Sequence, residues 1–407
     1  MVLYVFCTNL LFTLTFKVQL LSISCLEGIM NKFKKLPIVL LSTGLVFGVS
    51  TVAHSSVSLA SISGWEADVS GSIPVFFVVS DFEDDEDASR IMSGFNPANL
   101  TFSVAAPKSN GITVTSRVQI DTHLQGSQTQ NSGLFESRVA EIQVDGDFGT
   151  VNVGKGFGIF NSSAIGDLGS GMGVGFMGGG PDTGNTTGGR IGTGYVYANF
   201  NPRIMYSSNN MGGITYKVGL FNPEEPTDSA GGARTSLPRF EGQVNYAMNM
   251  DDSDLKLWAG FMWQEVKLIV EDVDYDMQGL DIGFHLDIAN FGFTGAYTDT
   301  EGVGADGLYG IGGISDAEVD GSQWYFEGDV VVGATTYGLS YGEGEQDSHT
   351  APFAVADVKN ELTMLFVRHK VTDNLTVMGE LQDYESTTGS VTSTEYNAVA
   401  VGLQFDF

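Results

Sequence analysis

The sequence contains little cysteine and no long apolar run in its main part. Its 407 residues include two cysteines, Cys7 and Cys25, and both precede residue 30. The rest of the chain can therefore form no disulfide, and the absence of free thiols there suits passage through an oxidising compartment. After residue 60 no apolar run is long enough to cross a bilayer as a helix, which takes about 20 residues. This excludes a bundle of membrane-spanning helices.

Basic residues are scarce as well. Lysine and arginine number 19 against 49 aspartates and glutamates, which gives a formal net charge of −30. That balance disfavours a nucleic-acid partner, because the phosphate backbone is itself anionic. An acidic surface or lumen attracts cations and repels anions, so we expect a mild preference for cations in any channel that the chain forms.

Signs of an enzyme or of a cofactor site are also missing. The histidines show no paired spacing of the kind that metal ligands have, and no Ser/His/acid constellation stands out. One stretch, Gly173–Gly178, matches a dinucleotide-binding fingerprint, but it lies in a glycine-rich region with no βαβ unit around it. The sequence therefore predicts no enzymatic activity, no metal and no cofactor.

The most informative segment that is present comes last, at residues 396–407. Counting back from Phe407 in steps of two gives only apolar residues as far as Val399, and the residues between them are polar or small. Because a strand sends alternate side chains to opposite faces, one face of this segment suits hydrocarbon and the other suits water. The pattern predicts a membrane-spanning strand that ends on an aromatic residue.

The N-terminal part reads as a processing signal. A basic stretch, then an apolar one and then small residues follow Met30, which is the layout of a secretory signal peptide. Candidate cleavage sites lie at 53–55 and 58–60. We expect three segments: an extension from an upstream start codon at 1–29, a signal peptide at 30–60, and the folded domain at 61–407.

Segments of alternating apolar and polar residues recur through the folded domain. Short turns join them in pairs, and Asn110-Gly111 between two such segments is a strong hairpin signal. Counting the terminal strand, we find sixteen segments. Eight longer polar connections lie between the pairs: 81–98, 122–134, 156–200, 221–238, 264–279, 299–321, 342–358 and 384–394.

This arrangement predicts an all-β fold, a transmembrane antiparallel β-barrel of about 16 strands. The barrel must be closed, because strands in lipid cannot leave the N–H and C=O groups of an edge unpaired. A barrel of that size is too wide for side chains to fill and encloses an aqueous channel. About fourteen and about eighteen strands are the alternatives, since weak alternating segments are easily miscounted.

Several motifs carry a family resemblance. Val139–Lys155 reads VAEIQVDGDFGTVNVGK, with Gly146–Thr150 as its most specific part, and Val-Ser-Gly stands at 69–71. Together with the terminal Phe407 and the Phe200–Leu220 hairpin, these motifs resemble the general diffusion porins of Gram-negative outer membranes. The resemblance implies trimers of sixteen-stranded barrels, with the third external loop folded into the lumen as a constriction. It also implies that the final aromatic residue is part of the signal read by the insertion machinery.

In that family, acids on the third loop oppose a basic cluster on the barrel wall. The corresponding loop, residues 156–200, departs from the family by holding 15 glycines between Gly156 and Gly194. Arg138 shares the parity of the apolar residues of its strand, so we expect it at a subunit contact. The residues that match the constriction are Asp167 and Asp182 on the loop, and Arg117, Lys155, Arg203 and Lys217 on the wall.

The resemblance implies an outer-membrane channel for passive diffusion of ions and small hydrophilic solutes. The expected partners are two more copies of the chain in a homotrimer, outer-membrane lipid and lipopolysaccharide, and the diffusing solutes. Two alternatives stay open: a substrate-selective outer-membrane channel, and a structural barrel that acts as an adhesin or a phage receptor.

Overall fold

The computed structural model describes most of the chain after residue 55. The described residues are 56–83, 87–122, 124, 136–177, 186–223, 233–250, 252–268, 273–303, 319–348 and 356–407. All of them belong to one structural unit, Leu45–Phe407. The expected extension at 1–29 and most of the expected signal peptide at 30–60 lie outside the described residues.

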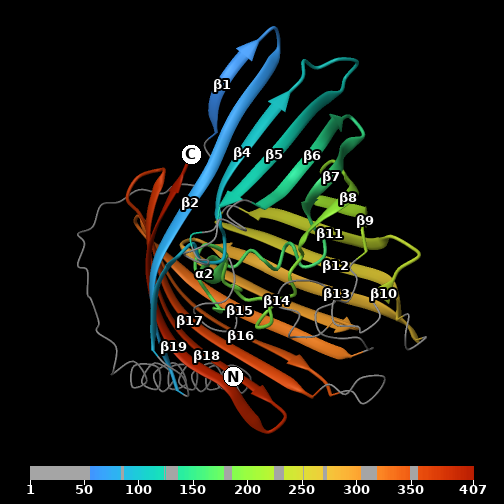
Figure 1. Ribbon diagram of the computed structural model, residues 1–407. Helices are drawn as coiled ribbons and strands as arrows, with labels where there is room; N and C mark the ends of the chain where they lie inside the picture. Colours follow the sequence, from blue (N-terminus) through green and yellow to red (C-terminus); the bar gives the residue numbers. More distant parts are fainter. Residues whose placement is uncertain are drawn as a thin grey trace, which may run out of the picture. The chain divides into compact units, whose positions relative to one another are not determined.

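Sixteen strands form a closed antiparallel β-barrel, which confirms the predicted fold class (Figure 1). The helix α2 (Leu168–Gly171) is a single turn, and among the described residues no helix is long and apolar enough to cross a membrane. The barrel strands are β2 (Trp65–Phe82), β4 (Ala98–Ala105), β5 (Thr113–Thr122), β6 (Glu136–Gly146), β7 (Gly149–Phe157), β8 (Phe200–Ser207), β9 (Ile214–Phe221), β11 (Arg239–Met250), β12 (Ser253–Leu268), β13 (Val273–Ile288), β14 (Phe291–Glu301), β15 (Asp320–Val332), β16 (Thr335–Gln346), β17 (Val358–Lys370), β18 (Leu375–Thr388) and β19 (Val391–Asp406).

The first and last barrel strands close the ring. β19 pairs with β2 as far as Asp406 opposite Ser72. The last residue continues the pairing: the N–H of Phe407 donates to the Gly71 carbonyl at 3.0 Å, and its carbonyl accepts the Gly71 N–H at 2.7 Å. Every barrel strand therefore has two neighbours, which satisfies the requirement that no strand edge faces lipid.

Three further short strands occur among the described residues: β1 (Val57–Ile62), β3 (Ala88–Met92) and β10 (Ala233–Arg234). β1 forms a hairpin with the start of β2, with Ile62 opposite Trp65. Of the two candidate cleavage sites, the one at 58–60 would cut β1, whereas the one at 53–55 would leave it whole.

The alternation of the sequence separates an exposed face from a buried face. In β13, Leu280 and Ile282 are 62% and 58% exposed, whereas Asp281 between them is 1% exposed. In β19, Leu403 and Val401 are likewise exposed. The exposed face thus carries an apolar band that suits hydrocarbon.

In strand β17, apolar residues lie on the buried face. Its apolar residues Leu362, Met364 and Phe366 are at most 4% exposed, and they belong to the buried face. The alternation correctly grouped them on one face, but an apolar face need not contact lipid. Here it packs inside the protein, as described below for the third loop.

Two connections are much shorter than predicted. β12 and β13 pair as far as Leu268 opposite Val273, and β18 and β19 are joined by a tight turn. The long loops predicted at 264–279 and 384–394 were therefore wrong. At these strand ends the outward side chains are polar, and in β12 and β13 the apolar side chains Val266, Tyr275 and Met277 lie on the buried face, at most 4% exposed. The outward apolar pattern therefore stops while the backbone pairing continues.

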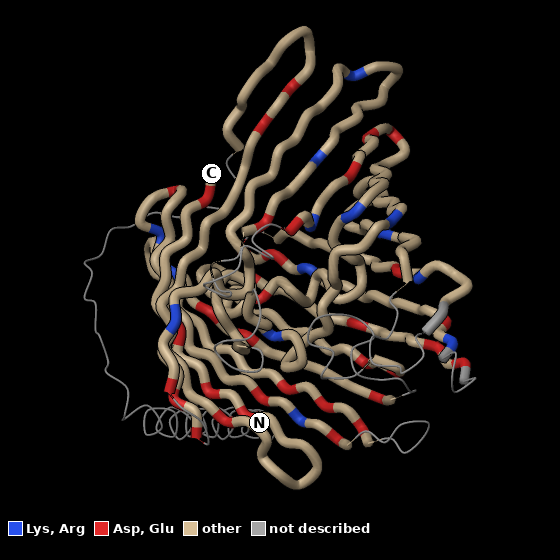
Figure 2. The backbone as a smooth tube through the Cα atoms, in the orientation of Figure 1, with Lys and Arg blue, Asp and Glu red and all other residues tan. Residues whose placement is uncertain are grey.

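Acidic side chains are spread over β12 to β19, and basic ones are few (Figure 2). Near the connection between β16 and β17, Lys359 Nζ lies 3.6 Å from Glu343 and 3.4 Å from Glu361. Such solvated pairs contribute little stability, about 0–1 kcal/mol each. They keep the strand ends beyond the apolar band polar.

Candidate functional site

The connection between β7 and β8, residues 158–199, is here called the third loop. Its start is held by Glu241 on β11, which accepts the backbone N–H groups of Ile159 and Phe160 at 2.6 and 3.0 Å. Arg239 on the same strand donates to the other carboxylate oxygen at 2.8 Å. Hydrogen bonds to an ionised acceptor are about twice as strong as neutral ones, so this anchor fixes where the loop begins.

Two further carboxylates hold the middle of the third loop. Glu327 on β15 accepts the N–H groups of Leu168 and Gly169 at 2.7 and 3.0 Å. Glu380 on β18 accepts the Val174 N–H at 3.1 Å. The first turn of a helix leaves its N–H groups unpaired, so Glu327 supplies acceptors that α2 itself lacks. Each bond of this charged kind contributes about 1.5–3 kcal/mol.

Arg368 on β17 is the counter-ion of this arrangement. It donates to Glu380 Oε1 at 2.7 Å and also to the Gly169 carbonyl. Its side chain is 6% exposed and that of Glu380 is fully buried. Removing one partner of such a pair leaves an uncompensated buried charge, which typically costs about 3–5 kcal/mol.

The glycines of the third loop permit this close approach of backbone to carboxylate. A β-carbon on Gly169 would lie 2.9 Å from Glu327 Oε2, and one on Gly173 would overlap Glu380 Oε1. Gly171 differs, since a β-carbon there would meet nothing closer than 3.8 Å. Part of the loop's unusual glycine content is thus explained by its carboxylate anchors.

Asp167 is occupied within the third loop. It caps α2 by accepting the Ser170 N–H at 2.8 Å, and it lies 3.7 Å from Arg190 Nε. The Tyr195 hydroxyl donates to it at 3.2 Å, and burial raises the pKa of that hydroxyl well above its usual value, which keeps it a donor. Asp167 is 2% exposed, so its charge is compensated locally rather than by the barrel wall.

Apolar packing joins the third loop to the strands in three clusters. Each cluster combines loop residues with side chains of the buried face, which explains why that face is apolar on β17. The loop members and their main partners are Val174, Phe176 and Met177 with Phe76, Leu362, Met364, Tyr384 and Tyr396; Phe160 and Val196 with Met262, Val266, Tyr275 and Met277; and Ala164, Ile191 and Tyr195 with Trp258, Ala296 and Tyr325.

On the part of the wall formed by β5, β6 and β8, two predicted site residues bind the same carboxylate. Arg117 on β5 and Arg203 on β8 place Nη2 atoms 2.6 and 2.9 Å from the two oxygens of Glu141 on β6. Lys217 on the neighbouring strand β9 has no carboxylate within ion-pair distance among the described residues. Arg203 is 8% exposed, and its Nε and Nη1 atoms have no partner among the described residues. This part of the wall therefore carries more basic than acidic groups.

The remaining predicted members lie elsewhere. Lys155 is opposite Ala140 and Pro202 on the adjacent strands, on the same face as Val153, which is 44% exposed. The structure therefore does not bring Lys155 to the cluster around Glu141. Asp182 lies outside the described residues.

The subunit contact predicted for Arg138 stays a prediction. The pairing of β5 with β6 slips by one residue between Gln119 and Asp121. A bulge of this kind inserts an extra residue and reverses the facing of the side chains beyond it. Arg138 lies within this bulge; its side chain is 12% exposed, and its guanidinium lies 5.4 Å from the centre of the Phe200 ring.

Comparison with known families identifies the fold. A family described as Gram-negative porin matches residues 44–389. The chain belongs to this family. No curated protein matches the sequence of this porin.

Solved structures share the fold of this porin at low sequence identity. DcaP, an outer membrane channel of Acinetobacter baumannii, has a TM-score of 0.65 and 14% identity over 85% of this chain and 99% of its own. An anion-selective porin from Comamonas acidovorans has a TM-score of 0.62 and 17% identity, over 84% of this chain and 100% of its own. The trimer form of OmpT, an outer membrane protein of Vibrio cholerae, has a TM-score of 0.54 and 15% identity, over 85% of this chain and 100% of its own.

Family and fold together place this porin in the outer membrane as a transmembrane β-barrel. The exposed apolar band fits that location. Sequence reasoning located the strands but missed the groups that hold the third loop. The available signal was an acidic residue at buried-face parity on several strands: Glu241 on β11, Asp281 on β13, Glu327 on β15 and Glu380 on β18.

Proposed function

We propose that this porin forms a water-filled channel for passive diffusion of ions and small hydrophilic solutes. The observation that carries the proposal is the one-sided attachment of the third loop. Its anchors Glu241, Glu327 and Glu380 stand on β11, β15 and β18. Arg117 and Arg203 bond instead to a carboxylate of their own wall. The third loop would then narrow the lumen, with the aqueous path between it and β5–β9.

We also propose that the porin assembles as a homotrimer through the outer face of β4–β6. That face is apolar, with Phe102, Val118 and Ile142 between 41% and 50% exposed. In a ring of three identical subunits, one part of such a face on each subunit meets a different part on the next, and the Vibrio protein of the same fold is described as a trimer. The rest of the apolar band would contact outer-membrane lipid and lipopolysaccharide.

Channel activity is tested by single-channel recording of the purified protein in planar bilayers. A large step that is linear in voltage supports the proposal, and no conductance supports the structural barrel of an adhesin or phage receptor. Liposome swelling with sugars of graded size then separates a general sieve from a substrate-selective channel. Only the sieve admits every sugar below a single size limit.

Ion preference follows from two opposing charges. The net charge of −30 favours cations, whereas the basic groups around Glu141 favour anions locally. We propose that the effect of the net negative charge is slightly larger, so that the channel mildly prefers cations. Lys217→Gln is therefore expected to raise the cation-to-anion permeability ratio roughly twofold, because one charge in a solvated lumen contributes under about 1 kcal/mol.

The reversal potential in a KCl gradient measures this ratio. Lys108→Gln is the matched control, because Lys108 is exposed in the turn between β4 and β5 and should leave the ratio unchanged. Anion preference in the unaltered porin, or no change in Lys217→Gln, would contradict the proposed balance of charges.

We propose no catalytic role. Among the described residues, no group of three or more His, Cys, Asp or Glu side chains could hold a metal ion. The family and the fold are those of a channel. The proposal predicts that solutes pass through the pore unmodified.

A further inference from the structure

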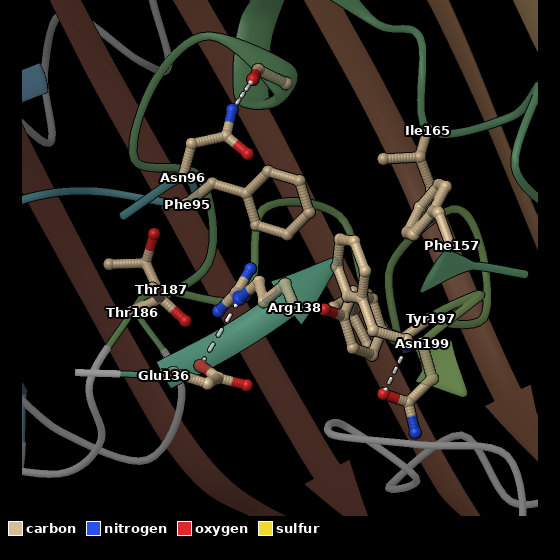
Figure 3. A pocket seen from close by; sticks show the side chains of 13 residues that line it. Phe95, Asn96, Glu136, Arg138, Phe157, Ile165, Thr186, Thr187, Tyr197 and Asn199 are labelled. Carbon is tan, nitrogen blue, oxygen red and sulfur yellow. Dashed lines mark hydrogen bonds and ion pairs between the residues drawn. The ribbon is translucent and has the colours of Figure 1, made fainter. Parts of the chain in front are cut away.

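A cavity of about 620 Å³ lies where β6, β7 and β8 meet the third loop and the residues Phe95 and Asn96 that precede β4 (Figure 3). Volumes of about 300–1,000 Å³ are usual for small-molecule sites. The cavity is separate from the basic cluster around Glu141, since none of the residues of that cluster lines it. It therefore requires an explanation of its own.

Aromatic rings form one part of the cavity wall. The ring centres of Phe157 and Phe200 are 4.9 Å apart, and each lies 6.4 Å from that of Tyr197. Burial raises the pKa of Tyr197 to about 12, so its hydroxyl remains a neutral donor and acceptor. An apolar platform with a hydroxyl at its rim suits a ring that has C–H groups on its face and oxygen on its edge.

A guanidinium lies over this platform. Arg138 Nε donates to Glu136 Oε2 at 3.3 Å, and the guanidinium carbon lies 5.4 Å from the Phe200 ring centre. The two terminal nitrogen atoms of Arg138 make no hydrogen bond with any described residue. Their fork geometry matches a pair of adjacent oxygen atoms on a ligand.

The guanidinium of Arg138 could bind either an organic acid or an uncharged polyol, and the charge of the surrounding residues distinguishes between them. Arg138 is already paired with Glu136, and Asp121 at the nearby end of β5 adds a further acid. An organic acid would enter a site with no spare positive charge, whereas an uncharged polyol would not be repelled. Hydroxyl and amide groups of Thr186 and Asn96 also line the cavity.

We propose that this cavity binds an uncharged sugar of one or two rings, with a ring face on Phe157, Tyr197 and Phe200 and neighbouring hydroxyls on Arg138. The site adds recognition to a wall of the proposed channel. Binding itself does not require conduction, so the two proposals can fail separately.

The test is saturation-transfer NMR on the purified porin, with sucrose as the probe and a detergent that has no sugar head group. Sucrose is expected to bind saturably, with transfer to its ring C–H protons. Arg138→Gln is expected to weaken binding about tenfold, because it removes hydrogen bonds from a charged donor. Arg90→Gln on β3 is the matched control and should bind like the unaltered porin.

Tyr197→Leu provides a second test that leaves Arg138 in place, with Tyr246→Leu on the exposed face of β11 as its control. Tyr197→Leu is expected to reduce saturation transfer severalfold, and its control should not. An unchanged difference in gel mobility between the folded and the heat-unfolded protein shows that each variant is folded. Binding of sodium benzoate without sucrose, or sucrose binding that is equal in all variants, would overturn the proposal.

Discussion

Gly173→Ala is expected to detach the third loop from β18. The added methyl group would overlap Glu380 Oε1 and would lie 2.6 Å from Arg368 Nη2. The loop must then move away from the carboxylate that holds the Val174 N–H. Overpacking of this kind costs about 1–3 kcal/mol. The single-channel current should therefore flicker on the timescale of loop motion, microseconds to milliseconds, whereas the unaltered channel stays steady.

Gly171→Ala is the matched control, two positions away in the same loop. A β-carbon there meets nothing closer than 3.8 Å, so its current and its unfolding temperature should match those of the unaltered porin. Equal behaviour of Gly171→Ala and Gly173→Ala would show that the carboxylate contact does not hold the loop. Glu380→Gln should reproduce the flicker, because it weakens the same anchor without adding bulk.

Deletion of Phe407 is expected to reduce the assembled barrel at least about tenfold. The residue closes the ring through two backbone hydrogen bonds to Gly71, and its ring stacks on Phe405 at 5.7 Å between centres. Each backbone hydrogen bond lost at a strand edge costs on the order of 1 kcal/mol or more, and about 1.4 kcal/mol is a factor of ten. The family resemblance adds a second reason, since the final aromatic residue is expected to be read during insertion.

The assembled fraction is measured from outer-membrane fractions by the difference in gel mobility between folded and heat-unfolded protein. Phe291→Ala is the control, because Phe291 is another exposed aromatic residue at the turn end of a strand, 49% exposed. It should reduce assembly far less. Normal assembly without Phe407 would contradict the closing role given to this residue.

The fold was largely predictable because side-chain alternation is a local signal. All sixteen segments became strands, and the terminal strand paired with β2 as closure requires. The prediction failed where the outward side chains become polar. At 264–279 and 384–394 polar side chains occupy the outward face of the strand ends, so the strands are longer than the outward apolar pattern indicates.

The site was less predictable, because it depends on contacts between distant residues. Parity placed Arg117 and Arg203 on the buried face, and they do share Glu141. Parity is a weaker guide at Arg138, because the pairing of β5 with β6 takes in one extra residue there. No local pattern could reveal that Glu327 would accept the N–H group of Leu168, 159 positions away.

The most direct test of the account is the accessibility of single cysteines from the water-filled path. Cys7 and Cys25 are the only native cysteines, so a serine background for both is simple to make. In open channels, a negatively charged thiosulfonate should rapidly change the current through Lys217→Cys. It should leave Met364→Cys unchanged, because Met364 is 0% exposed in the cluster with the third loop. Faster modification of Met364→Cys than of Lys217→Cys would place the path on the wrong side of the loop and contradict the account.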